Sequence, residues 1–178
     1  MEYTNLSIRE WLTSKNPSSV DILVIKRRVD FIKSEIDFLE KQVLSRNISE
    51  VSLSPIFKRL LERSYQLVIE AIINICRHIV STKGWGTACT SKDFISKCIE
   101  HGVIPKVLGE KLIRHIAMRS IIVHRYLDID YKKLYIEARE LAIITREFEK
   151  NITNFLRKSA SNRKNITSQQ EDQLLFYM

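Results

Sequence analysis

Apolar residues recur every three or four positions along most of this chain, which is the spacing that gathers them on one side of an α-helix. The first such stripe lies between Val20 and Leu44 and consists of Ile22, Ile25, Val29, Ile32, Ile36, Leu39 and Val43. The charged residues of the same segment fall off this stripe, as they do on the solvent-facing side of a helix. The pattern therefore predicts a long amphipathic helix over residues 20–44.

A second long helix is predicted to begin at Ser54 and Pro55, because serine caps helices and proline suits their first turn. Its apolar positions are Leu60, Leu61, Leu67, Val68, Ala71, Ile72, Ile75 and Ile79. Gly84 and Gly86 then mark a loop. The aromatic residue between them, Trp85, is expected to be a packed lid residue and not a ligand platform.

Three more helices complete the predicted fold: a short one that Thr90 or Ser91 can cap and that His101-Gly102 would stop, a long one from Pro105 to Leu127, and a last one that follows Asp130 and extends to about Phe155. The chain has only 4 glycines and 3 prolines in 178 residues, so the turn residues that β-sheets need are scarce. We therefore expect an all-α fold, a bundle of four long helices plus one short helix.

The ends of the chain lack this periodicity. Residues 1–19 are interpreted as an N-terminal extension, 20–158 as the helical domain, and 159–178 as a flexible C-terminal tail, because that segment is largely polar. The final residues, 174–178, are unexpectedly apolar. They are interpreted either as a docking motif or as a segment that folds back onto the protein.

Composition adds expectations about the ligand and the cellular compartment of the protein. The 29 Lys and Arg residues against 21 Asp and Glu give a formal charge of +8, which attracts polyanions such as RNA but is a weak signal alone. The three cysteines have no Cys-x-x-Cys spacing, which suits a reducing compartment. Without a membrane-length apolar run or a signal-peptide layout, the sequence predicts a soluble, cytoplasmic protein.

Most familiar catalytic patterns are missing from the sequence. It has no glycine-rich phosphate loop and no His-Glu-x-x-His motif. The four histidines, His78, His101, His115 and His124, lack metal-ligand spacing, and the acidic residues are scattered. We therefore expect neither a metal nor another cofactor.

One short segment, Arg119–Tyr126 (RSIIVHRY), does carry suitable chemistry near the end of a predicted helix. Arginine presents a permanently charged fork of N–H groups to a phosphate, and histidine exchanges protons near neutral pH. Cleavage of an RNA strand without a metal requires both functions, charge stabilisation at the phosphate and proton transfer at the ribose or leaving oxygen.

Helix geometry constrains how these residues can cooperate. Five residues turn roughly 140° around a helix, so Arg119 and His124 do not share a face. Either the helix loosens near His124, or the cleft is shared with a second subunit. Tyr126, seven residues after Arg119, projects on nearly the same face as the arginine.

The order Arg, four residues, His, one residue, Tyr resembles the motif of HEPN ribonuclease toxins of the HepT type. Two further segments agree with that family: Glu62–Ala71 is similar to its second-helix signature, and His101–Pro105 to the connector before its motif helix. The resemblance extends over about residues 20–155. It implies a HEPN-type helical bundle that dimerises and cleaves RNA as the toxin of a toxin-antitoxin pair.

The same resemblance implies roles for individual residues. Arg119 would hold the scissile phosphate and His124 would transfer protons, with Glu70 and Ser120 as supporting residues. The implied antitoxin partner is a nucleotidyltransferase that attaches AMP to Tyr126, adding bulk and negative charge beside the RNA groove. One departure matters: the family usually has asparagine or another strongly polar residue directly after the motif arginine, and Ser120 reaches less far than an amide.

Two other functions remain compatible with the sequence. A HEPN module that holds RNA or a nucleotide without cleaving it is favoured by Ser120. A structural helical adaptor would use the positive charge to bind an acidic partner, and it would be indifferent to the loss of Arg119 or His124.

Overall fold

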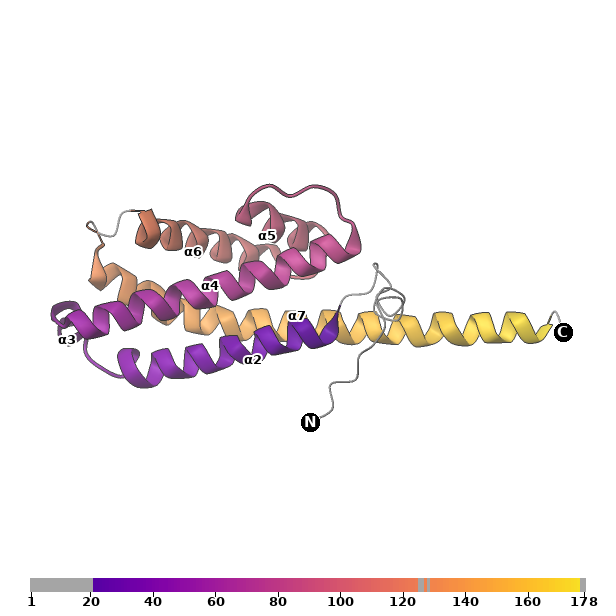
Figure 1. The fold of residues 1–178 in the computed structure, drawn as a ribbon, viewed down its shortest axis with the longest axis horizontal. Coiled ribbons are helices and arrows are strands. Elements are labelled where there is room, and N and C mark those ends of the chain that lie inside the picture. Colours follow the sequence, from indigo (N-terminus) through magenta and orange to yellow (C-terminus); the bar gives the residue numbers. More distant parts are fainter. Residues whose placement is uncertain (1–20, 125–126, 128, 177–178) are drawn as a thin grey trace, which may run out of the picture.

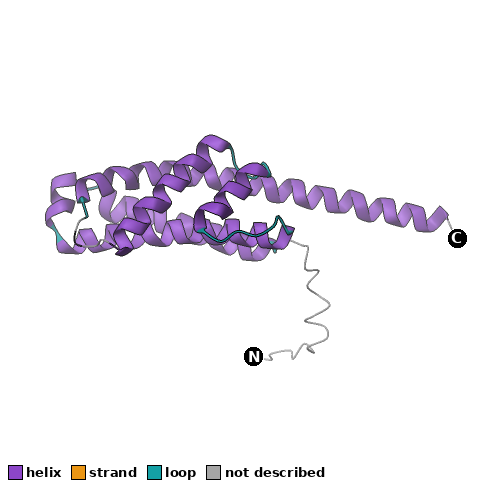
Figure 2. Cartoon of the chain, turned by 90° about the horizontal axis from the view of Figure 1, so that it is seen from above, coloured by secondary structure: helices purple, strands orange, loops and turns teal. Residues whose placement is uncertain are grey.

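The computed structural model describes residues 21–124, 127 and 129–176, with side chains described as far as residue 159. In chain order the elements are α2 (Ile22–Leu39), the π-helical turn η1 (Glu40–Leu44), α3 (Ile48–Leu53), α4 (Pro55–Lys83), α5 (Ser91–Glu100), α6 (Lys106–His124) and α7 (Tyr131–Phe176). Figure 1 and Figure 2 show these helices as an elongated bundle, and no strand occurs among the described residues. The predicted all-α fold is confirmed.

Helix α4 is the centre of the bundle, because α2, α3, α5, α6 and α7 all pack against it. Its most deeply buried residues are Leu61, Tyr65, Val68, Ile69, Ile72, Ile73, Ile75, Cys76, Ile79 and Val80. The predicted start is correct: the Ser54 hydroxyl accepts a hydrogen bond from the Phe57 N–H at 3.4 Å, and Pro55 occupies the first turn. Gly84 ends the helix at a φ of 63°, a conformation that glycine adopts without strain.

Helix α2 buries the predicted stripe against α4 and α7, with Ile25, Val29, Ile32, Ile36 and Leu39 all buried. The prediction of one continuous helix to Leu44 is modified by the π-helical turn, which keeps Val43 buried.

The short helix α3 was not predicted. It begins after Asn47, whose side chain accepts a hydrogen bond from the Glu50 N–H at 2.8 Å. Only Val51 of its six residues is buried. One buried residue makes no periodic pattern, so the spacing of apolar residues could not reveal this helix.

The loop before α5 packs as expected. Trp85 is partly buried against the core and stacks on His101, with 3.9 Å between ring centroids. Helix α5 then begins with a capping box, in which Thr90 and Asp93 each bond the other's backbone N–H.

The last helix, α7, is longer than predicted. It continues for 46 residues to Phe176 and extends beyond the bundle (Figure 1). The segment from residue 159, interpreted as a flexible tail, is therefore helical through Phe176; the proposed domain limit at 158 stays a prediction. None of the described helices, α7 included, is long and apolar enough to cross a membrane.

Candidate functional site

Helix α6 carries the predicted motif residues. Its apolar residues Leu108, Leu112 and Ile116 are buried, which fixes one side of the helix against the bundle. Helix α6 is described through His124; of the predicted continuation to Leu127, residues 125 and 126 lie outside the described residues, and Leu127 is 83% exposed. The end of the motif helix therefore emerges from the core.

A close approach of α5 shapes the surroundings of the motif. A Cβ atom at Gly109 would overlap the side chain of Ile99, so only glycine lets α5 lie this near to α6. The beginning of α5 is thereby brought beside the second half of α6, where the two helices share a hollow.

Arg119 is held by an acidic residue of α4. Its Nη2 donates a hydrogen bond to Glu70 Oε2 at 3.1 Å, and Glu70 also accepts one from Asn74 Nδ2 at 3.4 Å. The Arg119 and Glu70 side chains are 34% and 41% exposed, so water and ions reach both. A guanidinium has five N–H donors, and this ion pair occupies one of them. Arg119 can therefore bind a further anion while Glu70 holds it in place.

Ser120 and His124 line the hollow between α5 and α6, which has a volume of about 600 Å³. The complete lining is Thr90, Ser91 and Lys92 from α5 and its cap, and Ile116, Ala117, Ser120, Ile121 and His124 from α6. Both motif residues are exposed and lie four positions apart, on one face of the helix. The hollow thus combines three hydroxyls, an imidazole and a lysine with three apolar side chains.

Arg119 is not part of this lining. In a regular α-helix, Arg119 and His124 project about 140° apart around the axis. Helix α6 stays α-helical through His124, and the loosening considered from the sequence is not observed there. The second alternative, a cleft completed by another subunit, stays a prediction. Tyr126 lies outside the described residues.

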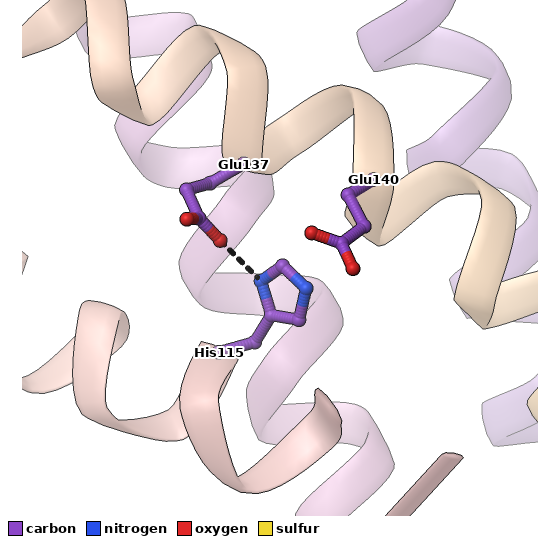
Figure 3. A group of neighbouring side chains, drawn as sticks. All are labelled: His115, Glu137 and Glu140. Atoms are coloured by element: carbon purple, nitrogen blue, oxygen red, sulfur yellow. Dashed lines mark ion pairs between the residues drawn. The ribbon is translucent and has the colours of Figure 1, made fainter. Parts of the chain in front are cut away.

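A second cluster of polar side chains lies between α6 and α7 (Figure 3). The fully buried His115 ring has its Nδ1 atom 2.6 Å from the Tyr65 hydroxyl and 3.5 Å from Glu137 Oε2. Glu140 lies beside the same ring, and Arg114 forms ion pairs with both carboxylates. Burial lowers the pKa of His115 to about 4 and raises the pKa of Tyr65, so both side chains are neutral near pH 7.

This cluster is the one group of potential metal ligands found among the described residues. Sequence reasoning missed it because Glu137 and Glu140 lie more than twenty positions from His115 on a different helix. The one signal of this cluster in the sequence is that Glu137 and Glu140 are three positions apart, which places them on one helical face.

The comparison with protein families shows the family to which this chain belongs. The model of a family described as "Ribonuclease HepT-like" matches residues 32–155. The chain belongs to the HepT-like ribonuclease family. The resemblance inferred from the Arg119, His124 and Tyr126 spacing is thereby confirmed at the level of the family.

Individual HepT-like relatives and solved structures agree. A protein of Aphanizomenon flos-aquae (strain 2012/KM1/D3) named tRNA nuclease HepT is 27% identical over 120 residues, which cover 66% of this chain and 80% of that protein. The cytosolic protein of unknown function YutE from Bacillus subtilis has the same fold, with a TM-score of 0.69, 21% identity and coverage of 79% of this chain and 93% of that one. A tri-AMPylated HEPN toxin of Shewanella oneidensis, solved in complex with an MNT antitoxin, gives a TM-score of 0.68 at 19% identity, covering 74% and 97% of the two chains.

The sequence predicted which motif residues lie on this helix, but only part of what surrounds them. Glu70 was expected as a supporting residue, and the structure joins it to Arg119. The contribution of α5 to the hollow was missed, because Thr90 and Ser91 were recognised only as candidate helix caps. Their nearness to α6 depends on the close packing at Gly109.

Proposed function

We propose that this HepT-like protein is a metal-independent endoribonuclease and the toxin of a HEPN and nucleotidyltransferase pair, which silences it by adenylylating Tyr126. The observation that carries the proposal is the arrangement on α6: Arg119 is held by Glu70, while Ser120 and His124 face an open hollow. The family match adds the class of reaction.

In this proposal Arg119 binds the scissile phosphate, because its guanidinium is permanently charged and has donors left over beside Glu70. His124 moves the proton at the ribose hydroxyl or at the leaving oxygen. Ser120 and Lys92 line the same hollow as His124 and supply a hydroxyl and a positive charge for the flanking nucleotide.

The working unit is a homodimer. Because Arg119 and His124 project from different faces of α6, a second copy would place an arginine and a histidine on opposite sides of one phosphate. The motif helices of the two copies would then line a shared groove.

The proposed partner is a nucleotidyltransferase of the MNT type, the class of antitoxin in the Shewanella oneidensis complex. An adenylate on Tyr126 would project toward the face of Arg119 and compete with RNA phosphate for that cation.

RNA cleavage by the purified protein in excess EDTA tests the proposal. A tRNA pool is the first substrate, because the cyanobacterial relative is named a tRNA nuclease. Arg119→Ala and His124→Ala should each reduce the rate on the order of 100-fold. Lys106→Ala is the matched control, since it removes an exposed positive charge from the same helix away from the motif.

Full activity in both motif variants, or cleavage only with an added divalent ion, would contradict the proposal. RNA binding without cleavage would instead indicate the non-catalytic HEPN module. Neither binding nor cleavage, with an acidic protein as the bound partner, would indicate the structural adaptor.

A further inference from the structure

The cluster between α6 and α7 has the composition of a metal site. It combines the imidazole of His115 with two carboxylates, Glu137 and Glu140, which project from adjacent turns of α7 toward the ring (Figure 3). One ligand atom from each of the three residues lies within 4.8 Å of the others. Ligands around a tetrahedral zinc ion are about 3.4 Å apart for bonds of about 2.1 Å, so side-chain adjustments of about 1 Å would close the site.

Two buried atoms of the cluster make no hydrogen bond, which is the usual way in which buried polar atoms are satisfied. Nε2 of His115 and Oε2 of Glu137 are buried without a hydrogen bond to any described residue. The Glu137 oxygen has longer contacts only, 3.5 Å to Nδ1 of His115 and 3.7 Å to Nε of Arg114. An unsatisfied buried polar atom costs about 1–3 kcal/mol, so a protein seldom keeps two of them side by side. A bound cation would satisfy both at once.

We propose that His115, Glu137 and Glu140 form a binding site for a divalent transition-metal ion, for which zinc is the best match. One nitrogen and two carboxylate oxygens are ligands that zinc accepts, and three protein ligands leave a position for water. Tyr65 orients the ring: when Nδ1–H donates to the tyrosine oxygen, the lone pair of Nε2 is free for the metal.

Arg114 is the competitor for this site. It pairs with both carboxylates, yet two negative charges face only one guanidinium, and the Arg114 side chain is 52% exposed. An arginine with that much solvent access can turn outward when a divalent ion takes its place. The metal would then join α6 to α7 one turn before Arg119.

This inference does not depend on the proposed ribonuclease activity, and its test involves no RNA. The untagged full chain, stripped with EDTA and dialysed, is titrated with Zn²⁺ in a calorimeter. One ion should bind per chain, and Glu137→Gln and Glu140→Gln should each weaken binding at least about tenfold. Glu110→Gln, which removes an exposed carboxylate from α6 outside the cluster, is the matched control and should bind as the wild type does.

A variant that should bind zinc more tightly tests whether weaker binding by the glutamine variants merely reflects loss of folding. Arg114→Ala removes the competing cation and should bind Zn²⁺ more tightly than the wild type. Zinc should also raise the melting temperature of the wild type but not that of Glu140→Gln, because a ligand stabilises only the state that binds it. Absence of binding at about 100 μM ion, or equal affinity of the wild type and both glutamine variants, would overturn the proposal.

Discussion

Glu70 connects the central helix α4 to the motif through its ion pair with Arg119. Glutamine at position 70 would keep a hydrogen-bond acceptor and lose the charge. Because both side chains are at least one-third exposed, we expect a screened contribution of about 1 kcal/mol, or about a fivefold lower cleavage rate.

Initial rates of tRNA cleavage by Glu70→Gln, the wild type and Arg119→Ala measure this effect. Glu110→Gln, with its exposed carboxylate, should cleave at the wild-type rate. A Glu70→Gln protein as impaired as Arg119→Ala would show that Glu70 takes part in the chemistry and does not merely position the arginine.

The tyrosine of the motif gives a covalent readout. Co-expression with a nucleotidyltransferase partner should add mass in steps of one AMP, and Tyr126→Phe should abolish that addition because the acceptor hydroxyl is gone. Intact-protein mass spectrometry measures both. Full modification of Tyr126→Phe, or unchanged RNA cleavage by the modified wild type, would refute the regulatory part of the proposal.

Single residues were predictable from the sequence when their signal was local. Arg119, His124 and Tyr126 lie within eight positions, so their spacing could be recognised before any fold was known. His115 became notable only after α7 was packed against α6, because that packing supplies both glutamates. The spacing of histidines along the chain carries no information about a ligand from another helix.

Between elements, the contact of α5 with α6 depends on Gly109. We expect Gly109→Val to destabilise the protein by about 1–3 kcal/mol, because added methyl groups must displace Ile99 from a packed interface. Urea unfolding followed by circular dichroism measures the change in the free energy of unfolding. Glu110→Val is the control, since it introduces the same side chain one position later, at an exposed residue. Equal losses of unfolding free energy in the two variants would mean that the close packing at Gly109 does not contribute to stability.

Elements with strong apolar stripes were predicted well, as α2 and α4 show. Helix α3 was not predicted because it buries only one residue. The sequence signal for this helix is the capping residue Asn47. The extension of α7 beyond residue 159 has no stripe to bury, so periodicity could not predict a helix there. Periodic apolar positions reveal which face of a helix packs on the core, and a segment without such positions gives no signal of this kind.

For the whole molecule, the proposed shared groove predicts complementation between two inactive variants. Light scattering at micromolar concentration should report about twice the chain mass. If Arg119 of one copy works with His124 of the other, mixing Arg119→Ala with His124→Ala creates dimers with one intact site, and a random mixture should recover about one quarter of the wild-type rate. No recovery despite subunit exchange, or a monomer that cleaves RNA, would exclude the shared groove.

Two bonds join α6 to α4, from His115 to Tyr65 and from Arg119 to Glu70. The α6 residues are four positions apart, so both bonds leave the same side of the helix. Rotating α6 by one residue would swing that side through about 100° and break both bonds together. The two bonds therefore fix the rotation of α6 about its own axis, and this rotation determines the direction in which Ser120 and His124 point. A single residue inserted into α6 ahead of His115 would keep every motif side chain but rotate all of them by about 100° around the helix axis, away from the positions that they occupy here.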